Sequence, residues 1–172
     1  MKGFTITEIL IATCIFLVLV LALFQSLDIS RSLWFTDEVS VELRREIIKT
    51  FTSMERELQG ARPALTNLAS GTSSANLTFS VPQDNDGDGT ILDATGNIEW
   101  SPQITYALNG SHQITRTTSG NTTIIANNIS TLLFTRPLSP VNIMQIDITA
   151  TKNTAFGRQI QDIGEISIEM RN

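Results

Sequence analysis

The amino-acid sequence predicts an α+β protein in which one long N-terminal α-helix packs against an antiparallel β-sheet. Residues 4–59 contain neither proline nor glycine, and their hydrophobic residues follow the spacing of a helix. From residue 77 onward, short segments alternate between hydrophobic and polar residues, which is typical of strands with one buried face. The length of 172 residues fits one domain, since domains average about 150 residues.

The composition excludes several classes of function. A net charge of -5 without a run of basic residues argues against contact with nucleic acid. The single cysteine, Cys14, and the single histidine, His112, cannot form a Cys/His zinc site, and one cysteine cannot form an internal disulfide. The sequence lacks the glycine-rich nucleotide motifs and the GxSxG motif that would give His112 a nucleophile. We therefore do not expect an enzyme.

Residues 4–24 form an apolar segment close to the about 20 residues that a helix needs to cross a bilayer. A secretory signal peptide and a plain membrane anchor both fit this length. The signal peptide would use Lys2 as its basic residue and residues 20–22 as its cleavage site. Neither explains Glu8, because a carboxylate near the membrane centre costs about 2.5–3.5 kcal/mol. Within this helix, Cys14 is expected to behave as a small buried hydrophobic residue.

The order of residues around Glu8 resembles the prepilin signal of type IV pilins and type II secretion pseudopilins: a basic residue, a glycine, a phenylalanine, three further residues, a glutamate and the apolar run. This resemblance implies that residues 1–3 are a leader peptide, that a prepilin peptidase cuts between Gly3 and Phe4, and that Phe4 is then N-methylated. It also implies that Glu8 pairs with the Phe4 amine of a neighbouring subunit in a filament. A paired charge is much less costly in lipid than an isolated one.

The same resemblance implies where the protein lies and what it contacts. Residues 4–27 would cross the bacterial cytoplasmic (inner) membrane once, with Lys2 inside and the head in the periplasm or outside the cell. The implied partners are membrane lipid, other pilin or pseudopilin subunits, the prepilin peptidase/methyltransferase and the inner-membrane assembly platform. A type II secretion system, a type IV pilus and a DNA-uptake pseudopilus remain open as the machine that the subunit serves.

The second half of the helix, residues 28–60, is predicted to be amphipathic. Hydrophobic residues recur every three or four positions along one face, and charged residues occupy most of the rest. Gly60 and Pro63 supply the signals that end the helix. The hydrophobic face, which we expect to pack against the head, consists of Phe35, Val39, Leu43, Ile47, Phe51, Met54 and Leu58.

Residues 61–172 are predicted to form a β-rich head that begins with a loop at 64–75. Asn109 and Gly110, which lie between two alternating runs, predict a hairpin turn. One face of the sheet is expected to cover the helix and the other to face solvent. The expected strands are 77–81, 104–108, 113–115, 122–125, 130–135, 141–149 and 163–170.

The segments of the head follow an order that resembles the heads of minor pilins and J-type minor pseudopilins. This resemblance implies the type IV pilin fold and a minor subunit that helps to assemble the filament or to initiate its tip. The alternative is a membrane- or filament-anchored adhesin, because a head rich in Ser, Thr and Asn also suits binding to an external surface.

The segment 84–95 begins like a calcium-binding loop. Acidic residues stand at positions 1, 3 and 5 and a glycine at position 6, but position 12 is a threonine where the calcium loop has glutamate. Between Arg62 and Arg116 there are five acidic residues and no Lys or Arg, so a divalent cation would relieve their repulsion. A solvated acidic turn explains the same residues. The candidate calcium ligands are Asp84, Asp86, Asp88, Thr90 and Asp93.

Overall fold

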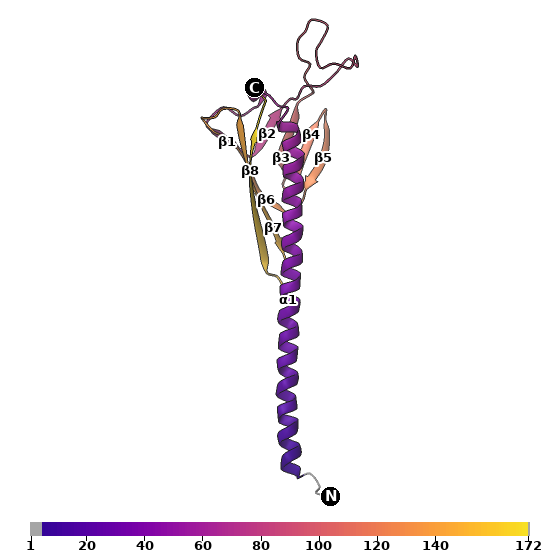
Figure 1. Ribbon diagram of the computed structural model, residues 1–172, viewed down its shortest axis with the longest axis vertical. Helices are drawn as coiled ribbons and strands as arrows, with labels where there is room; N and C mark the ends of the chain where they lie inside the picture. The colour runs from indigo at the N-terminus through magenta and orange to yellow at the C-terminus, as the bar shows by residue number, and fades with distance from the viewer. Residues whose placement is uncertain (1–4, 172) are drawn as a thin grey trace.

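The computed structural model describes residues 5–171 and shows one long helix with a β-rich head on its C-terminal half (Figure 1). Helix α1 (Ile6–Leu58) is 53 residues long and starts at the N-cap Thr5. It ends at Leu58, with Gln59 as the C-cap, immediately before Gly60, where the sequence predicts the end. The chain is therefore an α+β protein, and the prediction of one long N-terminal helix is confirmed.

The head contains two antiparallel sheets, whereas a single sheet was expected. The first sheet has the order β1-β6-β7-β8 and the second has the order β2-β3-β4-β5. The strands of the first sheet are β1 (Thr72–Ser74), β6 (Ile129–Arg136), β7 (Ile143–Asn153) and β8 (Gln159–Glu169). The strands of the second are β2 (Asn76–Phe79), β3 (Ile104–Leu108), β4 (Ile114–Thr118) and β5 (Asn121–Ala126).

The chain passes between the two sheets at short connections. Only Ala75 separates β1 from β2, and only two residues separate β5 from β6. One of these two, Asn128, has a φ of 61°, a left-handed conformation that asparagine adopts more readily than most residues. These sharp connections divide a row of alternating segments into two sheets. The predicted loop at 64–75 correspondingly contains most of the 3-10 helix η1 (Pro63–Leu65) and all of β1.

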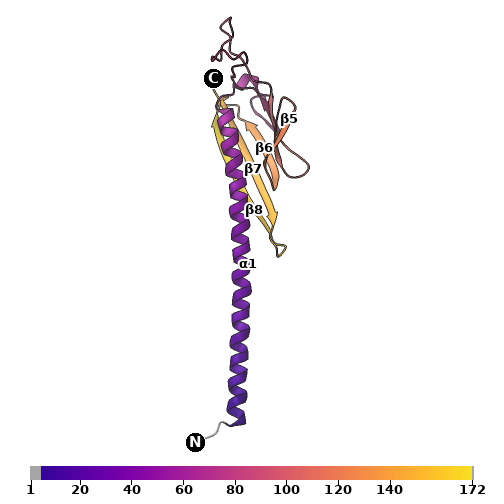
Figure 2. The ribbon, with the colours of Figure 1, turned by 90° about the vertical axis from the view of Figure 1, so that its right-hand side faces the viewer.

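Helix α1 packs with one face against β7, β8 and β5, and both long strands run along it (Figure 2). Its predicted hydrophobic face is buried at five positions, which are Val39, Leu43, Ile47, Met54 and Leu58. Phe51 is half-buried. Phe35 lies at the edge of the head, where its ring meets that of Phe156 edge to face, at 69° and with 5.6 Å between the centroids. The helix–head packing predicted from the sequence is thus confirmed.

Gly164 lets the helix approach β8 closely. A Cβ atom at this position would lie 2.5 Å from Cγ2 of Ile47 and 2.8 Å from Cε2 of Phe51. Gly164 belongs to the face of β8 that turns toward the helix, together with Ile166 and Ile168. Only a residue without a side chain fits at this crossing.

The connection between β3 and β4 is longer than the tight turn expected at Asn109 and Gly110, and the connection between β2 and β3 is a long loop. Asn109 and Gly110 begin a five-residue loop, because β3 and β4 pair from Leu108 and Ile114. Asn109 Oδ1 accepts hydrogen bonds from the backbone N–H groups of Ser111 and Gln113, both at 2.9 Å, so its side chain organises this longer loop. The segment between β2 and β3 projects beyond the C-terminal end of α1, at the top of Figure 1.

Candidate functional site

The start of α1 contains a capping box formed by Thr5 and Glu8. The backbone N–H of Thr5 donates to Glu8 Oε2 at 2.9 Å, and the Glu8 N–H donates to Thr5 Oγ1 at 3.3 Å. The Thr5 hydroxyl also lies 2.9 Å from Glu8 Oε2. Glu8 therefore satisfies backbone groups at the helix start in addition to its implied role in a filament. The predicted cleavage and methylation sites, Gly3 and Phe4, lie outside the described residues.

The spacing of a threonine and a glutamate three residues apart would have predicted this capping box from the sequence. The resemblance implies that Glu8 pairs between subunits, and its bonds to Thr5 were not predicted. Both interpretations place the carboxylate at the positive end of the helix dipole.

The first half of α1 is long enough and apolar enough to cross a membrane, judged by length and composition. None of its most apolar 18-residue window is buried by the rest of the chain. The Thr13 hydroxyl donates to the carbonyl of Ile9, so this polar group of the apolar segment is paired within the helix. Cys14 is exposed in the single chain, so the burial expected for it requires lipid or other helices.

Residues 84–99, which we call the aspartate loop, contain aspartates that each organise a local turn. Asp84 accepts hydrogen bonds from the N–H groups of Gly87 at 2.6 Å and Gly89 at 2.9 Å, which lower the pKa of its carboxyl group. Asp88 Oδ1 accepts from the N–H and the hydroxyl of Thr90, at 2.7 and 2.8 Å. These bonds are typical of Asx turns and do not require a cation.

Asp93, which was also among the candidate calcium ligands, forms a separate turn and lies outside the group of converging carboxylates. Hydrogen bonds from the Thr95 hydroxyl and the Asn97 N–H lower the pKa of Asp93 to about 2. Its carboxylate is therefore ionised at neutral pH. The aspartates at positions 1, 3 and 5 of the predicted calcium loop, which are Asp84, Asp86 and Asp88, likewise accept hydrogen bonds in separate turns.

Three carboxylates of the loop do converge, and one of them was not among the predicted ligands. Oxygen atoms of Asp84, Asp86 and Glu99 lie within 4.8 Å of one another. Glu99 comes from the returning segment, where its Oε2 accepts from the Asn85 N–H at 2.5 Å. Asp88 is outside this group and bonds to Thr90. Glu99 could have been found from the sequence, because it is one of the five acidic residues in the stretch without Lys or Arg.

Calcium titration of the full chain in detergent distinguishes a cation site from a solvated turn. Binding at the converging carboxylates predicts that about 1 mM calcium raises the melting temperature, as is usual for weak extracellular sites. Glu99→Gln should abolish this rise, because Glu99 belongs to the converging group, whereas Asp88→Asn should keep it. Each amide preserves the local hydrogen-bond acceptor, so neither change removes the turn itself. Calorimetry without heat and without a thermal shift would assign the loop as a solvated turn.

A hydrogen-bonded ion pair joins α1 to the second sheet. Glu57 Oε1 lies 2.8 Å from Arg116 Nη2, and the hydroxyl of Tyr106 donates to Glu57 Oε2 at 3.0 Å. The side chains of Glu57 and Arg116 are only 22% and 24% exposed. Burial, with a contribution from the Glu57 carboxylate, raises the pKa of Tyr106 to about 12. Glu57 is one of the charged residues outside the predicted hydrophobic face of the helix, and its pairing with the head was not predicted.

Further polar contacts fix the helix along the head. Lys152 Nζ lies 2.6 Å from Glu42 Oε2, and the Asn127 N–H donates to Glu46 Oε2 at 2.9 Å. His112 is exposed, and its Nδ1 lies 3.2 Å from the carbonyl oxygen of Ile129, so it joins the β3–β4 loop to the start of β6. These contacts have a structural role and form no arrangement of nucleophile and base.

Comparisons of the sequence and the fold with protein families, characterised proteins and solved structures found no match. Two features of the chain itself bear on its function. They are the ordered motif at the N-terminus and an apolar helix half that the head leaves uncovered.

Proposed function

We propose that this chain is a minor pilin or pseudopilin, a structural subunit of a type IV pilus-like filament or of a type II secretion pseudopilus. The observation that carries the proposal is the order of Lys2, Gly3, Phe4 and Glu8 directly before an apolar helix. A signal peptide or a simple anchor needs the apolar segment but has no use for an acidic residue at its start.

The exposure of the first half of α1 supports this proposal. Large side chains such as Leu10, Phe16 and Leu23 remain about two-thirds exposed in the single chain. A continuous apolar surface of this size is unstable in water and needs lipid before assembly and other helices after it. A filament subunit meets both environments, since its helix leaves the membrane and enters a helical bundle.

In this proposal, the prepilin peptidase removes residues 1–3 on the cytoplasmic side of the inner membrane and Phe4 is methylated. The assembly platform then extracts the helix, and Glu8 offsets the new positive charge at Phe4 of a neighbouring subunit. The head stays on the periplasmic or outer side, and the subunit acts in filament assembly or at the tip.

Mass spectrometry of the mature N-terminus tests the proposal directly. We expect the full chain, co-expressed with a prepilin peptidase, to lose residues 1–3 and to begin with methylated Phe4. The same chain expressed without the peptidase should keep its full length. A mature chain that still begins at Met1, or that begins after Ala22, would contradict the proposed processing.

Deletion of the gene separates an assembly role from the adhesin alternative. An assembly subunit predicts that filaments are lost or shortened when the gene is absent. Intact filaments with lost attachment would instead identify an adhesin.

A further inference from the structure

A groove lies at the end of the head that is farthest from the start of α1. Its volume is about 330 Å³, at the lower end of the range for ligand pockets. Figure 1 and Figure 2 both show the C-terminus beside the end of α1, close to the segment that connects β2 to β3. The lining of the groove combines large hydrophobic residues of this segment with two arginines: Ile91, Leu92, Ile98, Trp100, Arg62 and Arg171.

The hydrophobic wall of the groove is held by the backbone of the connecting segment. The segment folds back on itself, so that Pro82 pairs with Trp100 and Leu92 pairs with Ile98. Further backbone hydrogen bonds of 2.8–3.0 Å join its two arms. Ile91, Leu92 and Ile98 nevertheless remain 41%, 44% and 37% exposed. The wall is thus formed within the single chain, and the head leaves its hydrophobic surface uncovered.

The two arginines bring positive charge to the groove. Among residues 5–171, neither Arg62 nor Arg171 takes part in an ion pair. Both residues are exposed. The Arg62 guanidinium lies over the Trp100 ring, with its Cζ 5.8 Å from the ring centroid. This cation–π contact orients the guanidinium at the hydrophobic wall while the N–H groups at its edge stay available to an acceptor.

The charges around the groove limit the ligands that it can bind. Arginine binds carboxylate and phosphate groups through paired hydrogen bonds. Five acidic residues lie between Arg62 and Arg116, on and beside the same segment, so they repel a polyanion or a doubly charged phosphate. A single carboxylate next to a hydrophobic group suits both the arginines and the hydrophobic wall.

We propose that this groove binds a hydrophobic peptide segment of another protein, and that this segment carries one carboxylate. The carboxylate pairs with Arg62 and Arg171, and the neighbouring hydrophobic side chain lies against Trp100 and Leu92. A second copy of this chain is a poorer occupant, because the aspartates of its loop already accept hydrogen bonds in their own turns. Lipid around the first half of α1 is about 40 Å away along the helix.

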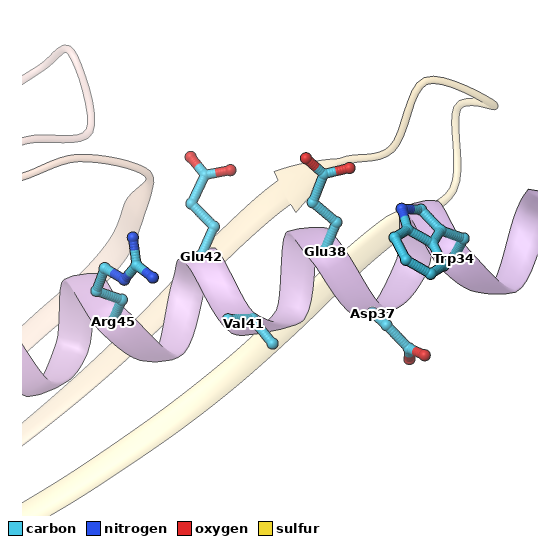
Figure 3. Close-up of a pocket in the computed structure, with 6 residues that line it drawn as sticks. All are labelled: Trp34, Asp37, Glu38, Val41, Glu42 and Arg45. Atoms are coloured by element: carbon cyan, nitrogen blue, oxygen red, sulfur yellow. The ribbon is translucent and has the colours of Figure 1, made fainter.

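A second groove that contains a tryptophan has the opposite charge pattern and serves as a control. It lies on the exposed side of α1. Figure 3 shows three carboxylates and one guanidinium around its tryptophan: Asp37, Glu38, Glu42, Arg45 and Trp34. Because the acids outnumber the arginine, we expect no binding of a carboxylate there.

Tryptophan fluorescence reads the two grooves separately, because the chain has two tryptophans. In the full-length Trp34→Phe chain, held in micelles of an uncharged detergent, only Trp100 emits. The probe is the acetylated tetrapeptide Ala-Ala-Leu-Phe, with either a free C-terminal carboxylate or a C-terminal amide. We expect the free acid to give a saturable change in emission and the amide to bind about tenfold more weakly or less, since hydrogen bonds to a charged group are lost. In the Trp100→Phe chain, Trp34 should not respond.

Substitutions at the arginines provide a second readout. Arg62→Gln and Arg171→Gln should each weaken binding of the free acid about tenfold and leave binding of the amide unchanged. Arg45→Gln, in the control groove, should leave both unchanged. Equal binding of acid and amide, no effect of either groove substitution, or tighter binding of inorganic phosphate overturns the proposal. A change in Trp100 emission with protein concentration alone would identify a second copy as the occupant and also overturns it. The proposal is independent of processing at Gly3.

Discussion

Gly164→Val is expected to lower the free energy of unfolding of the full chain by about 3 kcal/mol. The new side chain would occupy space already filled by Ile47 and Phe51 of α1, where even a Cβ atom would lie at 2.5 and 2.8 Å from their side chains. Ile47 is buried and branched at Cβ, and the Phe51 ring is rigid, so neither can move without displacing the helix. Urea unfolding in detergent micelles measures the change.

Gly110→Val is the matched control for this substitution. A Cβ atom at Gly110 would have no neighbour within 4 Å, and this glycine does not need a positive φ. The control should therefore change the free energy of unfolding by less than about 0.5 kcal/mol. Equal effects at both positions would show that the close approach of α1 to β8 is not the cause.

Glu57→Ala is expected to cost about 2 kcal/mol of stability. The substitution removes the carboxylate that pairs with Arg116 and accepts the Tyr106 hydroxyl, and it leaves both groups partly buried. Removing one partner of a fully buried pair costs about 3–5 kcal/mol, and the remaining exposure of about one-fifth reduces this figure. Glu38→Ala, on the exposed side of the same helix, should cost little.

A double-mutant cycle with Arg116→Ala tests the pair itself. Coupling predicts that the double variant loses less stability than the sum of the single variants, by more than about 0.5 kcal/mol. The protein has one tyrosine, so its ionisation can be followed directly by ultraviolet absorbance. Because Glu57 helps to raise the pKa of Tyr106, Glu57→Ala should lower that pKa from about 12. Additive stabilities and an unchanged pKa would contradict the assigned network.

Local patterns in the sequence predicted most elements of the fold. A helix can be recognised from its own hydrophobic period and its stop signals. The end of α1 near Gly60 and the burial of Leu43 and Ile47 could therefore be predicted. The alternation of residues 141–149 and 163–170 likewise predicted two strands, which the structure shows as β7 and β8 with bounds that reach further along the chain between them. Alternation does not reveal which strands pair, and for this reason the division into two sheets was missed.

Contacts between distant residues could not be read from the sequence. The ion pair of Glu57 and Arg116 joins residues 59 positions apart, and Glu99 reaches Asp84 and Asp86 only because its segment folds back. Gly164 interrupts an alternating strand without any local sign that a helix crosses there. The N-terminal motif, in contrast, consists of residues that are close together in the sequence and could be recognised there. The capping box of Thr5 and Glu8 shows the structure of part of this motif.

The contact between Phe156, at the tip of the β7–β8 hairpin, and Phe35 sets how far the head reaches down the helix. The helix between its start at Ile6 and this contact is about 44 Å long at 1.5 Å per residue. The hydrocarbon core of a bilayer takes about 30 Å of this length. In a membrane, the hairpin would therefore hold the head about 14 Å above the lipid on a rigid spacer. Lengthening or shortening the hairpin would change that clearance without altering either the anchor or the core of the head.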